Sequence, residues 1–169
     1  QAASPDVVIS QVYGGGGSTG APYANDFVEL FNRGPNAVSM TGWSVQYASA
    51  TGTGTFGSAI APTVLAGTLQ PGQHYLVQMA SGGAVGAPLP TADVMGSVPL
   101  SATAGKVALV QSTTALACNG GSTPCTAGQL ALIRDLVGYG SANFFEGPGP
   151  TGTLSNITAA LRGANGCTD

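Results

Sequence analysis

Apolar and polar side chains alternate with a period of two along several short stretches of this chain, most clearly from Asp26 to Tyr47. Within that stretch, an apolar-aromatic run interrupted by Glu29 is followed by a polar turn at residues 32–36 and by further alternation. Two alternating runs joined by a turn rich in Gly, Pro and Asn are typical of a β-hairpin. The stretch therefore predicts strand, turn and strand, with Trp43 buried in the core of a sandwich.

Short runs of the same kind recur along the chain, separated by glycine and proline. None of them shows the i, i+3, i+4 apolar spacing of an amphipathic helix, because glycine interrupts every candidate. We therefore expect no helix, and an all-β sandwich or barrel with turns at many of the 27 glycines and 11 prolines. The predicted strands cover residues 7–13, 26–32, 38–48, 74–80, 94–98, 106–111, 130–139 and 154–161, and a further short strand is considered at 55–60.

One of these runs, residues 130–139, does not alternate cleanly. Arg134 and Asp135 are neighbours, so in a regular strand they would point to opposite faces of an otherwise apolar segment. We therefore expect a bulge or a bend at this position.

Charge is scarce in this chain, which limits the partners that it can bind. Charged residues make up 7% of the sequence, against roughly 25% in a typical soluble protein, and the formal net charge is −3. Nucleic-acid binding needs several cations to neutralise phosphates, and only Arg33, Lys106, Arg134 and Arg162 are cationic. The chain alone is therefore not expected to bind nucleic acid. The chain contains no run of about 20 predominantly apolar residues, so no transmembrane helix is predicted.

The cysteines indicate an oxidising compartment. Cys118 and Cys125 flank a polar, Gly-rich loop, and a disulfide between them is favoured over free thiols or a metal site. A metal site is disfavoured because His74 is the only histidine and the chain has no C-x-x-C pair. Cys167 is left over and could stay free, pair with another chain, or pair with a cysteine beyond this sequence. A start at Gln1 that resembles a mature N-terminus after signal cleavage also favours a secreted or cell-surface protein.

Calcium is the one cofactor that the carboxylates suggest. Hard oxygen ligands suit this ion, and Gly-rich loops can supply carbonyl oxygens. Asp26 with Asn25, and Asp135 with Glu146, are the pairs that we consider as calcium ligands. No D-x-D-x-D-G loop is present, and the structural alternative for Asp26 and Glu29 is turn capping and a cross-strand hydrogen bond.

Three further motifs have mainly structural interpretations. Residues 15–20 match G-x-G-x-x-G, but a dinucleotide site needs a helix directly after the glycines, and here another predicted strand follows. His74 lies inside a predicted strand and no G-x-S-x-G elbow is present, so we expect a surface histidine rather than a catalytic one. Asn156 begins an N-x-T pattern for N-glycosylation, or alternatively a polar strand start.

Six segments of the chain form a recognisable series: ELFN at 29–32, GWSVQY at 42–47, LQPGQHYLV at 69–77, GKVALV at 105–110, DLVGYG at 135–140 and GCTD at 166–169. In their order and spacing, over nearly the whole chain, they resemble the lamin tail domain in the version found in bacterial secreted proteins. The resemblance implies an immunoglobulin-like β-sandwich of about eight or nine strands with long Gly-rich loops, forming a single domain over residues 1–169.

The same resemblance bears on the end of the chain. The bacterial version usually continues past the GCTD segment into an acidic, Asn-rich loop and a final strand, whereas this sequence stops at Asp169. We therefore expect the last strand to be missing or to be supplied from elsewhere. An edge exposed in this way would invite strand pairing with a protein partner or with a second copy.

Three functions follow as hypotheses. The first is a non-catalytic interaction module of a secreted or cell-surface bacterial protein, accessory to an extracellular nuclease or phosphatase domain. The second is a self-assembling subunit of a surface filament or layer, since low charge reduces repulsion between copies and Cys167 is left over. The third is a metal-dependent extracellular hydrolase, which the scarcity of cations disfavours. No catalytic residue is assigned.

Overall fold

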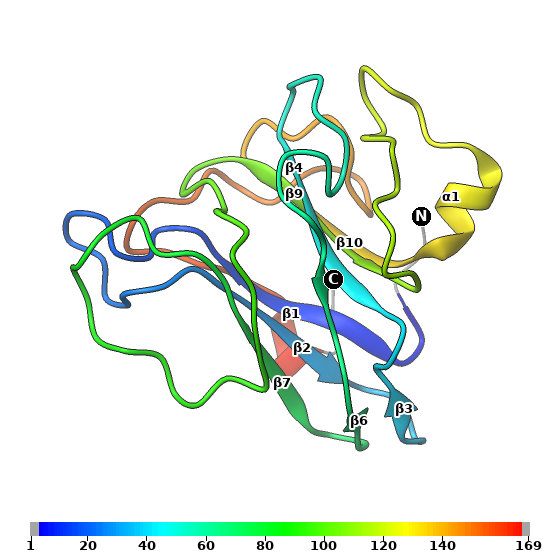
Figure 1. Cartoon of the computed structure of the whole chain (residues 1–169), viewed down its shortest axis with the longest axis horizontal. Helices are drawn as coiled ribbons and strands as arrows, with labels where there is room; N and C mark the ends of the chain where they lie inside the picture. The colour runs from blue at the N-terminus through cyan, green and yellow to red at the C-terminus, as the bar shows by residue number, and fades with distance from the viewer. Residues whose placement is uncertain (1–3, 167–169) are drawn as a thin grey trace.

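The computed structural model describes residues 4–166 and folds them into two β-sheets that face each other across a common core (Figure 1). The first sheet has the strand order β11-β1-β2-β7-β8, the second has the order β10-β9-β4-β5, and β3 pairs with β6 in a small ribbon. The strands are β1 (Val7–Tyr13), β2 (Phe27–Asn32), β3 (Val38–Ser39), β4 (Ser44–Ser49), β5 (Thr63–Val64), β6 (Thr68–Leu69), β7 (His74–Gln78), β8 (Val94–Met95), β9 (Gly105–Val110), β10 (Ile133–Tyr139) and β11 (Ala160–Leu161).

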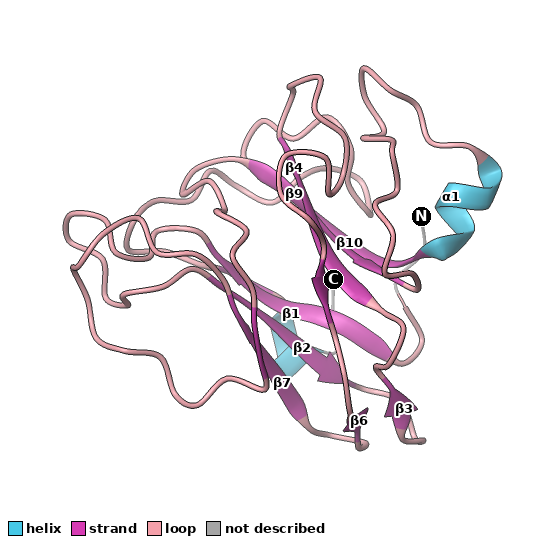
Figure 2. Cartoon of the chain, viewed as in Figure 1, coloured by secondary structure: helices cyan, strands magenta, loops and turns pink. Residues whose placement is uncertain are grey.

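The prediction of an all-β sandwich is confirmed, and loops make up much of the rest of the chain (Figure 2). Every strand pair is antiparallel except β7 with β8. The alternation that predicted β1 matches its observed bounds of Val7 and Tyr13. Several strands are only two residues long, so the sheets depend mainly on β1, β2, β4, β7, β9 and β10.

The main core lies between the two sheets. β1 and β2 contribute alternate side chains from the first sheet, and β9 contributes Val107 and Leu109 from the second. Fully burying one such side chain stabilises the fold by roughly 1.5–3 kcal/mol. The other buried members include Val7, Ile9, Val12, Val28, Leu30, Met40, Val45, Leu65, Leu69, Val77, Met79 and Tyr139.

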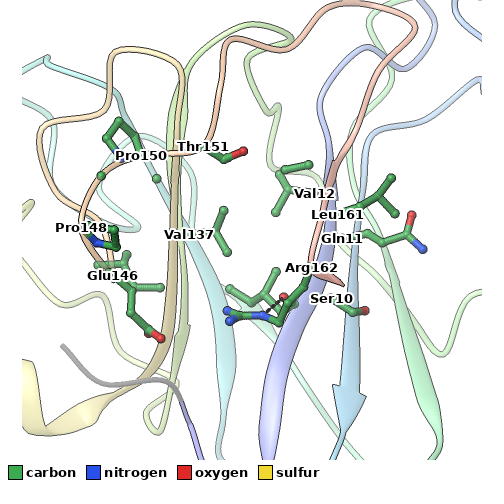
Figure 3. Close-up of a pocket in the computed structure, with 16 residues that line it drawn as sticks. Ser10, Gln11, Val12, Val137, Glu146, Pro148, Pro150, Thr151, Leu161 and Arg162 are labelled. Atoms are coloured by element: carbon green, nitrogen blue, oxygen red, sulfur yellow. Dashed lines mark hydrogen bonds between the residues drawn. The ribbon is translucent and has the colours of Figure 1, made fainter. Parts of the chain in front are cut away.

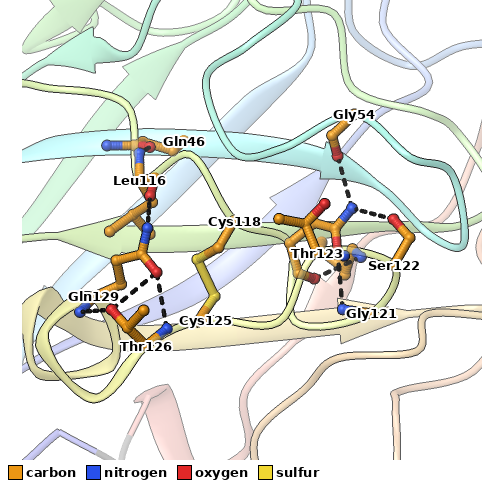
Figure 4. Close-up of a disulfide and its surroundings, with 12 residues drawn as sticks. Gln46, Gly54, Leu116, Cys118, Gly121, Ser122, Thr123, Cys125, Thr126 and Gln129 are labelled. Carbon is orange, nitrogen blue, oxygen red and sulfur yellow. Dashed lines mark hydrogen bonds between the residues drawn. A yellow bond between two sulfur atoms is a disulfide. The ribbon is translucent and has the colours of Figure 1, made fainter.

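A second, smaller core covers the outer face of the second sheet. All six residues of β9 are buried, because Ala108 and Val110 point away from the sandwich into a cluster with Leu116, Phe56 and Cys118. The cover is the loop closed by the disulfide between Cys118 and Cys125, which confirms the predicted pairing (Figure 4). This sheet is therefore buried on both faces.

Lys106 ties that cover to the rest of the molecule. Its side chain is fully buried, and its Nζ donates hydrogen bonds to the carbonyl of Asn119 at 2.8 Å and to Oδ1 of Asn143 at 2.9 Å. Burial lowers the pKa of the Lys106 amine. One of the four cations of the chain is thus used to join the disulfide loop to the segment after β10.

The prediction of no helix was wrong. Residues 127–132, the end of which was expected to belong to a strand, form α1 (Ala127–Leu132), and α2 (Gly163–Gly166) is a single short turn. A capping box begins α1: Thr126 Oγ1 accepts from the backbone N–H of Gln129, whose side chain accepts from the Thr126 N–H. No residue of α1 is buried, so the helix has no apolar stripe that periodicity could reveal.

Several predicted strands are shorter than expected. The run 38–48 is divided into β3 and β4 by a turn at Gly42, whose φ of 87° suits glycine. Residues 55–60 form turns and bends rather than a strand, and only the last two residues of 154–161 are strand. Trp43 packs against the core as expected but is half-buried, so its burial is smaller than the sequence predicted.

The expected irregularity in the 130–139 run is confirmed. The register between β10 and β9 shifts between Ile133 and Asp135, as in a β-bulge. The prediction for Cys167 lies outside the described residues. Within residues 4–166, no helix has the length and hydrophobicity needed to cross a bilayer.

Replacing both disulfide cysteines by alanine should lower the free energy of unfolding by about 2 kcal/mol. The bond closes a loop with a sequence separation of 7 residues, and cross-linking a loop of that size removes roughly this much entropy from the unfolded chain. Urea unfolding of Cys118→Ala/Cys125→Ala beside the unchanged protein measures the difference. Equal midpoints in the two proteins would contradict a stabilising role for the bond.

Candidate functional site

The two sheets are open along one side, where a cavity of about 350 Å³ lies between β10 and β11 (Figure 3). We name it the β10–β11 cavity. Both strands are the terminal members of their sheets. Figure 3 shows Glu146, Pro148 and Pro150 on the β10 side, with Gln11 and Leu161 on the opposite side. The lining is mainly apolar (Ile9, Val12, Leu136, Val137, Pro148, Pro150, Leu161), with Ser10, Gln11, Glu146 and Arg162 as the main polar side chains.

The outer edge of β10 is only partly paired. The Thr151 N–H donates to the carbonyl of Gly138 at 2.9 Å, and the Gly140 N–H donates to the carbonyl of Thr151 at 2.9 Å. Among the described residues, no strand of the sheets continues this pairing toward the start of β10. In an antiparallel ladder, residues two apart present their backbone groups on the same side. The N–H and C=O of Leu136 therefore lie on the same side of β10 as those of Gly138, although the residue as a whole is buried.

A buried carboxylate joins the two sheets at the base of the cavity. Asp135 on β10 is fully buried, and its Oδ2 accepts a hydrogen bond of 2.6 Å from the backbone N–H of Ile9 on β1. Arg162 Nη2 donates to both Asp135 oxygens, at 3.2 and 3.1 Å, and its Nε donates to the Ile9 carbonyl at 3.1 Å. We name these three residues the Asp135–Arg162–Ile9 clamp.

Two bulges make the clamp geometrically feasible. The register of β1 with β2 shifts between Ile9 and Gln11, and that of β10 with β9 shifts between Ile133 and Asp135. A bulge releases backbone groups from the ladder and turns the local side chains. Here it lets the backbone N–H and C=O of Ile9 bind Asp135 and Arg162. The Arg162 N–H donates in turn to the Ser10 carbonyl at 2.9 Å, which fixes the chain after β11.

Glu146 is the neighbour of the clamp that lacks a donor. Both of its carboxyl oxygens are buried, and neither accepts a hydrogen bond from the described residues. Burial and the negative charge of Asp135 raise the pKa of Glu146 to about 7, with Arg162 opposing them. Two ionised carboxylates have no proton to share, so their contact becomes a hydrogen bond only when one is protonated. The proton belongs on Glu146, because Asp135 already accepts three hydrogen bonds, from the Ile9 N–H and from Arg162 Nη2.

Comparison with known proteins identifies the family. The model of the Lamin Tail Domain matches residues 1–139. This chain belongs to the lamin tail domain family. Its two-sheet architecture is accordingly that of an immunoglobulin-like sandwich, as the resemblance implied. No curated protein matches the chain.

Only some of the residues around the β10–β11 cavity lie within the part of the chain that the family model matches. β1 and β10, with Ile9 and Asp135, lie within the matched residues of the lamin tail domain, whereas Glu146, β11 and Arg162 follow them. The lamin tail domain family is an immunoglobulin-like, non-catalytic family. Glu146, the carboxyl in the lining that has no counter-charge of its own, therefore lies beyond the residues that the family model matches.

Asp26 has a structural role in this lamin tail domain. It is buried at the start of β2, where Oδ1 accepts from the Gly16 N–H at 2.8 Å and Oδ2 accepts from the Leu100 N–H at 2.9 Å. Burial raises its pKa to about 6, and the two amides oppose that rise. Its neighbour Asn25 donates to the Met79 carbonyl at 3.0 Å. Asp26 thus fastens two loops, consistent with the capping alternative.

The calcium prediction stays untested, and the donors do not favour it. The structure brings Asp135 and Glu146 together but places Asp26 outside the cavity that they line or adjoin. Asp135 is occupied by a guanidinium, which takes the place that a cation would need. Within residues 4–166, no group of three or more His, Cys, Asp or Glu side chains is arranged to hold a metal ion.

His74 does not form a catalytic triad. Its Nδ1 lies 3.0 Å from Oε1 of Glu29, and the same oxygen accepts from the Ser10 hydroxyl at 2.7 Å. A triad needs the serine to donate to the histidine, whereas here both donate to the carboxylate. Gln11 also donates to Glu29 from the neighbouring strand, at 3.1 Å. The cross-strand interpretation of Glu29 is therefore confirmed.

The glycine-rich loop after β1 is packed rather than open to a phosphate. A Cβ on Gly16 would lie 2.0 Å from the backbone of Asn25, and one on Gly15 would lie 2.5 Å from that of Asn156. No helix follows this loop before β2. The glycines allow close backbone contact, so the dinucleotide interpretation has no support here.

The sequence did not reveal Arg162 as the partner of Asp135. The two residues are separated by 27 positions, and the third member of the clamp is a backbone group of Ile9. The one available signal was the small number of cationic residues. A chain with four cations offers few partners that could neutralise Asp135, a carboxylate inside an apolar run.

Breaking the clamp should destabilise the protein far more than breaking an exposed ion pair. Arg162→Leu leaves Asp135 buried without its counter-charge, which costs about 3 kcal/mol or more. The matched control is Arg134→Leu, because Arg134 pairs with Asp6 at side-chain exposures of 26% and 29%, against 7% and 0% for Arg162 and Asp135. The control should cost about 1 kcal/mol or less. Urea unfolding of both variants tests this, and equal losses would contradict it.

Glu146 should make stability depend on pH. Its pKa rises from the ordinary value of 4.5 to about 7 in the folded protein, so the folded state holds a proton that the unfolded chain has lost. The stabilising contribution is fully present below about pH 4.5 and is lost as pH rises through about 7. After allowance for partial exposure, we expect roughly 1–2 kcal/mol.

The measurement is the free energy of unfolding of the unchanged protein minus that of Glu146→Gln, followed from pH 4 to pH 8. Glutamine keeps the shape and does not titrate. Asp26, whose pKa is also raised, is present in both proteins and cancels in the difference. The difference should fall as pH rises. Two parallel profiles would show that Glu146 does not titrate in this window.

Proposed function

We propose that this lamin tail domain is a non-catalytic interaction module of a secreted or cell-surface protein, and that it binds an extended segment of a partner in the β10–β11 cavity. The observation that carries the proposal is the outer edge of β10, which is unpaired toward the start of the strand and lies beside an apolar cavity. Adding a strand to an exposed edge gives affinity through backbone hydrogen bonds, and pockets for alternate side chains give specificity.

The cavity offers both backbone hydrogen-bonding groups and apolar contacts for side chains. Leu136 supplies backbone groups along the edge of β10. Val137 and Leu161 supply apolar contacts from opposite walls. Leu161 is 68% exposed on β11, which is unusual for a large apolar side chain at a sheet edge. An occupant between β10 and β11 would cover it.

The chemistry of the rest of the molecule supports a binding role rather than catalysis. The arrangement of Ser10, Glu29 and His74 does not activate the serine, and Asp26 and Asp135 are occupied by hydrogen-bond donors. Chemistry in a protein that contains this module would therefore reside in another domain, such as an extracellular nuclease or phosphatase. The disulfide supports a location outside the reducing cytoplasm.

Self-association is a second candidate, favoured by the other sheet edges. Three terminal strands each carry an exposed apolar side chain: Met95 on β8 at 73%, Leu161 on β11 at 68% and Val64 on β5 at 48%. Such edges can pair between copies, and low charge does not oppose this. Light scattering coupled to size-exclusion chromatography tests it, and a single monomer peak at micromolar concentration would remove it.

The proposed binding site predicts a position-specific loss of affinity. Heptapeptides selected from a random display library on the unchanged protein should bind Leu161→Ser about tenfold more weakly, because burying a leucine contributes roughly 1.5–3 kcal/mol. The matched control is Ile157→Ser, since Ile157 is 67% exposed but does not line the cavity. Fluorescence polarisation of labelled peptides measures both.

Two results would contradict the proposed function. One is that no peptide is enriched on the folded protein. The other is that Leu161→Ser and Ile157→Ser weaken the selected peptides equally, which would place binding elsewhere. Because both side chains are exposed, neither substitution should lower stability appreciably, and circular dichroism confirms that each variant is folded.

A further inference from the structure

We propose that the β10–β11 cavity selects partner segments that carry a lysine or arginine, and that Glu146 receives the cationic head of this side chain. The inference rests on the proposed function, since it specifies the partner of the same site. It is drawn from Glu146, whose two buried carboxyl oxygens accept no hydrogen bond from the described residues.

The state of Glu146 is the first step. Both carboxyl oxygens are buried, and neither accepts a hydrogen bond from residues 4–166. Buried polar atoms are nearly always hydrogen-bonded, so each exception calls for a partner that is absent. Glu146 lines the cavity, and because its carboxyl oxygens are buried, a donor brought by a ligand would meet them after the side chain turns toward the cavity.

The balance of charge decides which donor. Arg162 is committed to Asp135 and to the Ile9 carbonyl by three hydrogen bonds between 3.1 and 3.2 Å. Among the side chains of residues 4–166, Asp135 and Arg162 together are neutral, so an ionised Glu146 leaves this group of three with one surplus negative charge. A cation offsets that charge, whereas an acidic side chain would add to the repulsion between Glu146 and Asp135.

The shape of the lining suits a long cationic side chain. Val137 and Leu161 present apolar surface on the way into the cavity. Lysine and arginine carry an aliphatic stem that packs on such surface while the charged head reaches a polar partner. The stem would contact these walls while the head lies at Glu146. A short polar residue at the same strand position would leave the apolar walls uncovered.

Binding of a cation is expected to be linked to protonation. The charged groups that face Glu146 from the described elements are Asp135 on β10 and Arg162 after β11, while β1 contributes only the neutral Ser10 and Gln11. With the pKa of Glu146 near 7, the free protein holds a proton there below neutral pH. A bound cation displaces that proton, so affinity should rise as pH increases from 6 to 8.

The experiment selects the heptapeptide library in parallel on the unchanged protein and on Glu146→Gln at pH 8. We expect the peptides selected on the unchanged protein to share a lysine or arginine at one position, and this preference to disappear on Glu146→Gln while the apolar preferences remain. One enriched peptide is then synthesised with its basic residue or with norleucine. Fluorescence polarisation should show a loss of about tenfold or more for norleucine, and a weaker preference for the basic peptide at pH 6.

The outcomes separate this inference from the proposed function. Peptides that depend on Leu161 but show no basic preference would overturn the inference and leave the proposed function standing. The same holds for a basic preference that survives in Glu146→Gln. If no peptide depends on Leu161, the proposed function fails and the inference fails with it. Circular dichroism and urea unfolding of Glu146→Gln at pH 8 establish that this variant is folded during selection.

Discussion

The buried ion pair between Asp135 and Arg162 is the interaction on which the open side of the sandwich depends. A carboxylate in such a position costs several kcal/mol in lost hydration. Three hydrogen bonds from the Ile9 N–H and Arg162 Nη2 offset that cost, and Arg162 is in turn held by the Ile9 carbonyl. Because Ile9 belongs to one sheet and Asp135 to the other, the clamp fixes the separation of the two sheet edges. The β10–β11 cavity exists because those edges are joined at their base by the clamp and are not paired with each other above it.

Low charge determines how such a domain can recognise anything. With 7% charged residues, the surface generates little long-range field, so a partner is not steered from a distance. Recognition then relies on short-range terms: backbone hydrogen bonds along β10, apolar contact with Leu161, and a single carboxyl at Glu146. One charge matters more here than on an ordinary protein surface, because few others compete with it and it lies where water is largely excluded.

The sequence predicted those features that local chemistry decides. Alternation located β1, and the disulfide followed from two cysteines around a short polar loop. The neighbouring charges at Arg134 and Asp135 predicted the bulge in β10. Helix α1 escaped prediction because it buries nothing, so only its capping residues mark it. The clamp escaped because one partner is a backbone group exposed by an unforeseen bulge near Ser10, in a strand whose side chains alternate regularly.

Comparison of the buried carboxyls shows why Glu146 differs from a structural acid. Asp26 accepts hydrogen bonds from two backbone amides, and Asp135 accepts three within the clamp. Both therefore stabilise contacts between segments distant in sequence. The ionised Glu146 carboxylate accepts no hydrogen bond from the described residues, and its charge is opposed by Asp135. The ionised carboxyl of Glu146 therefore gains a partner only when a hydrogen-bond donor enters the cavity. A cationic donor would also offset its negative charge.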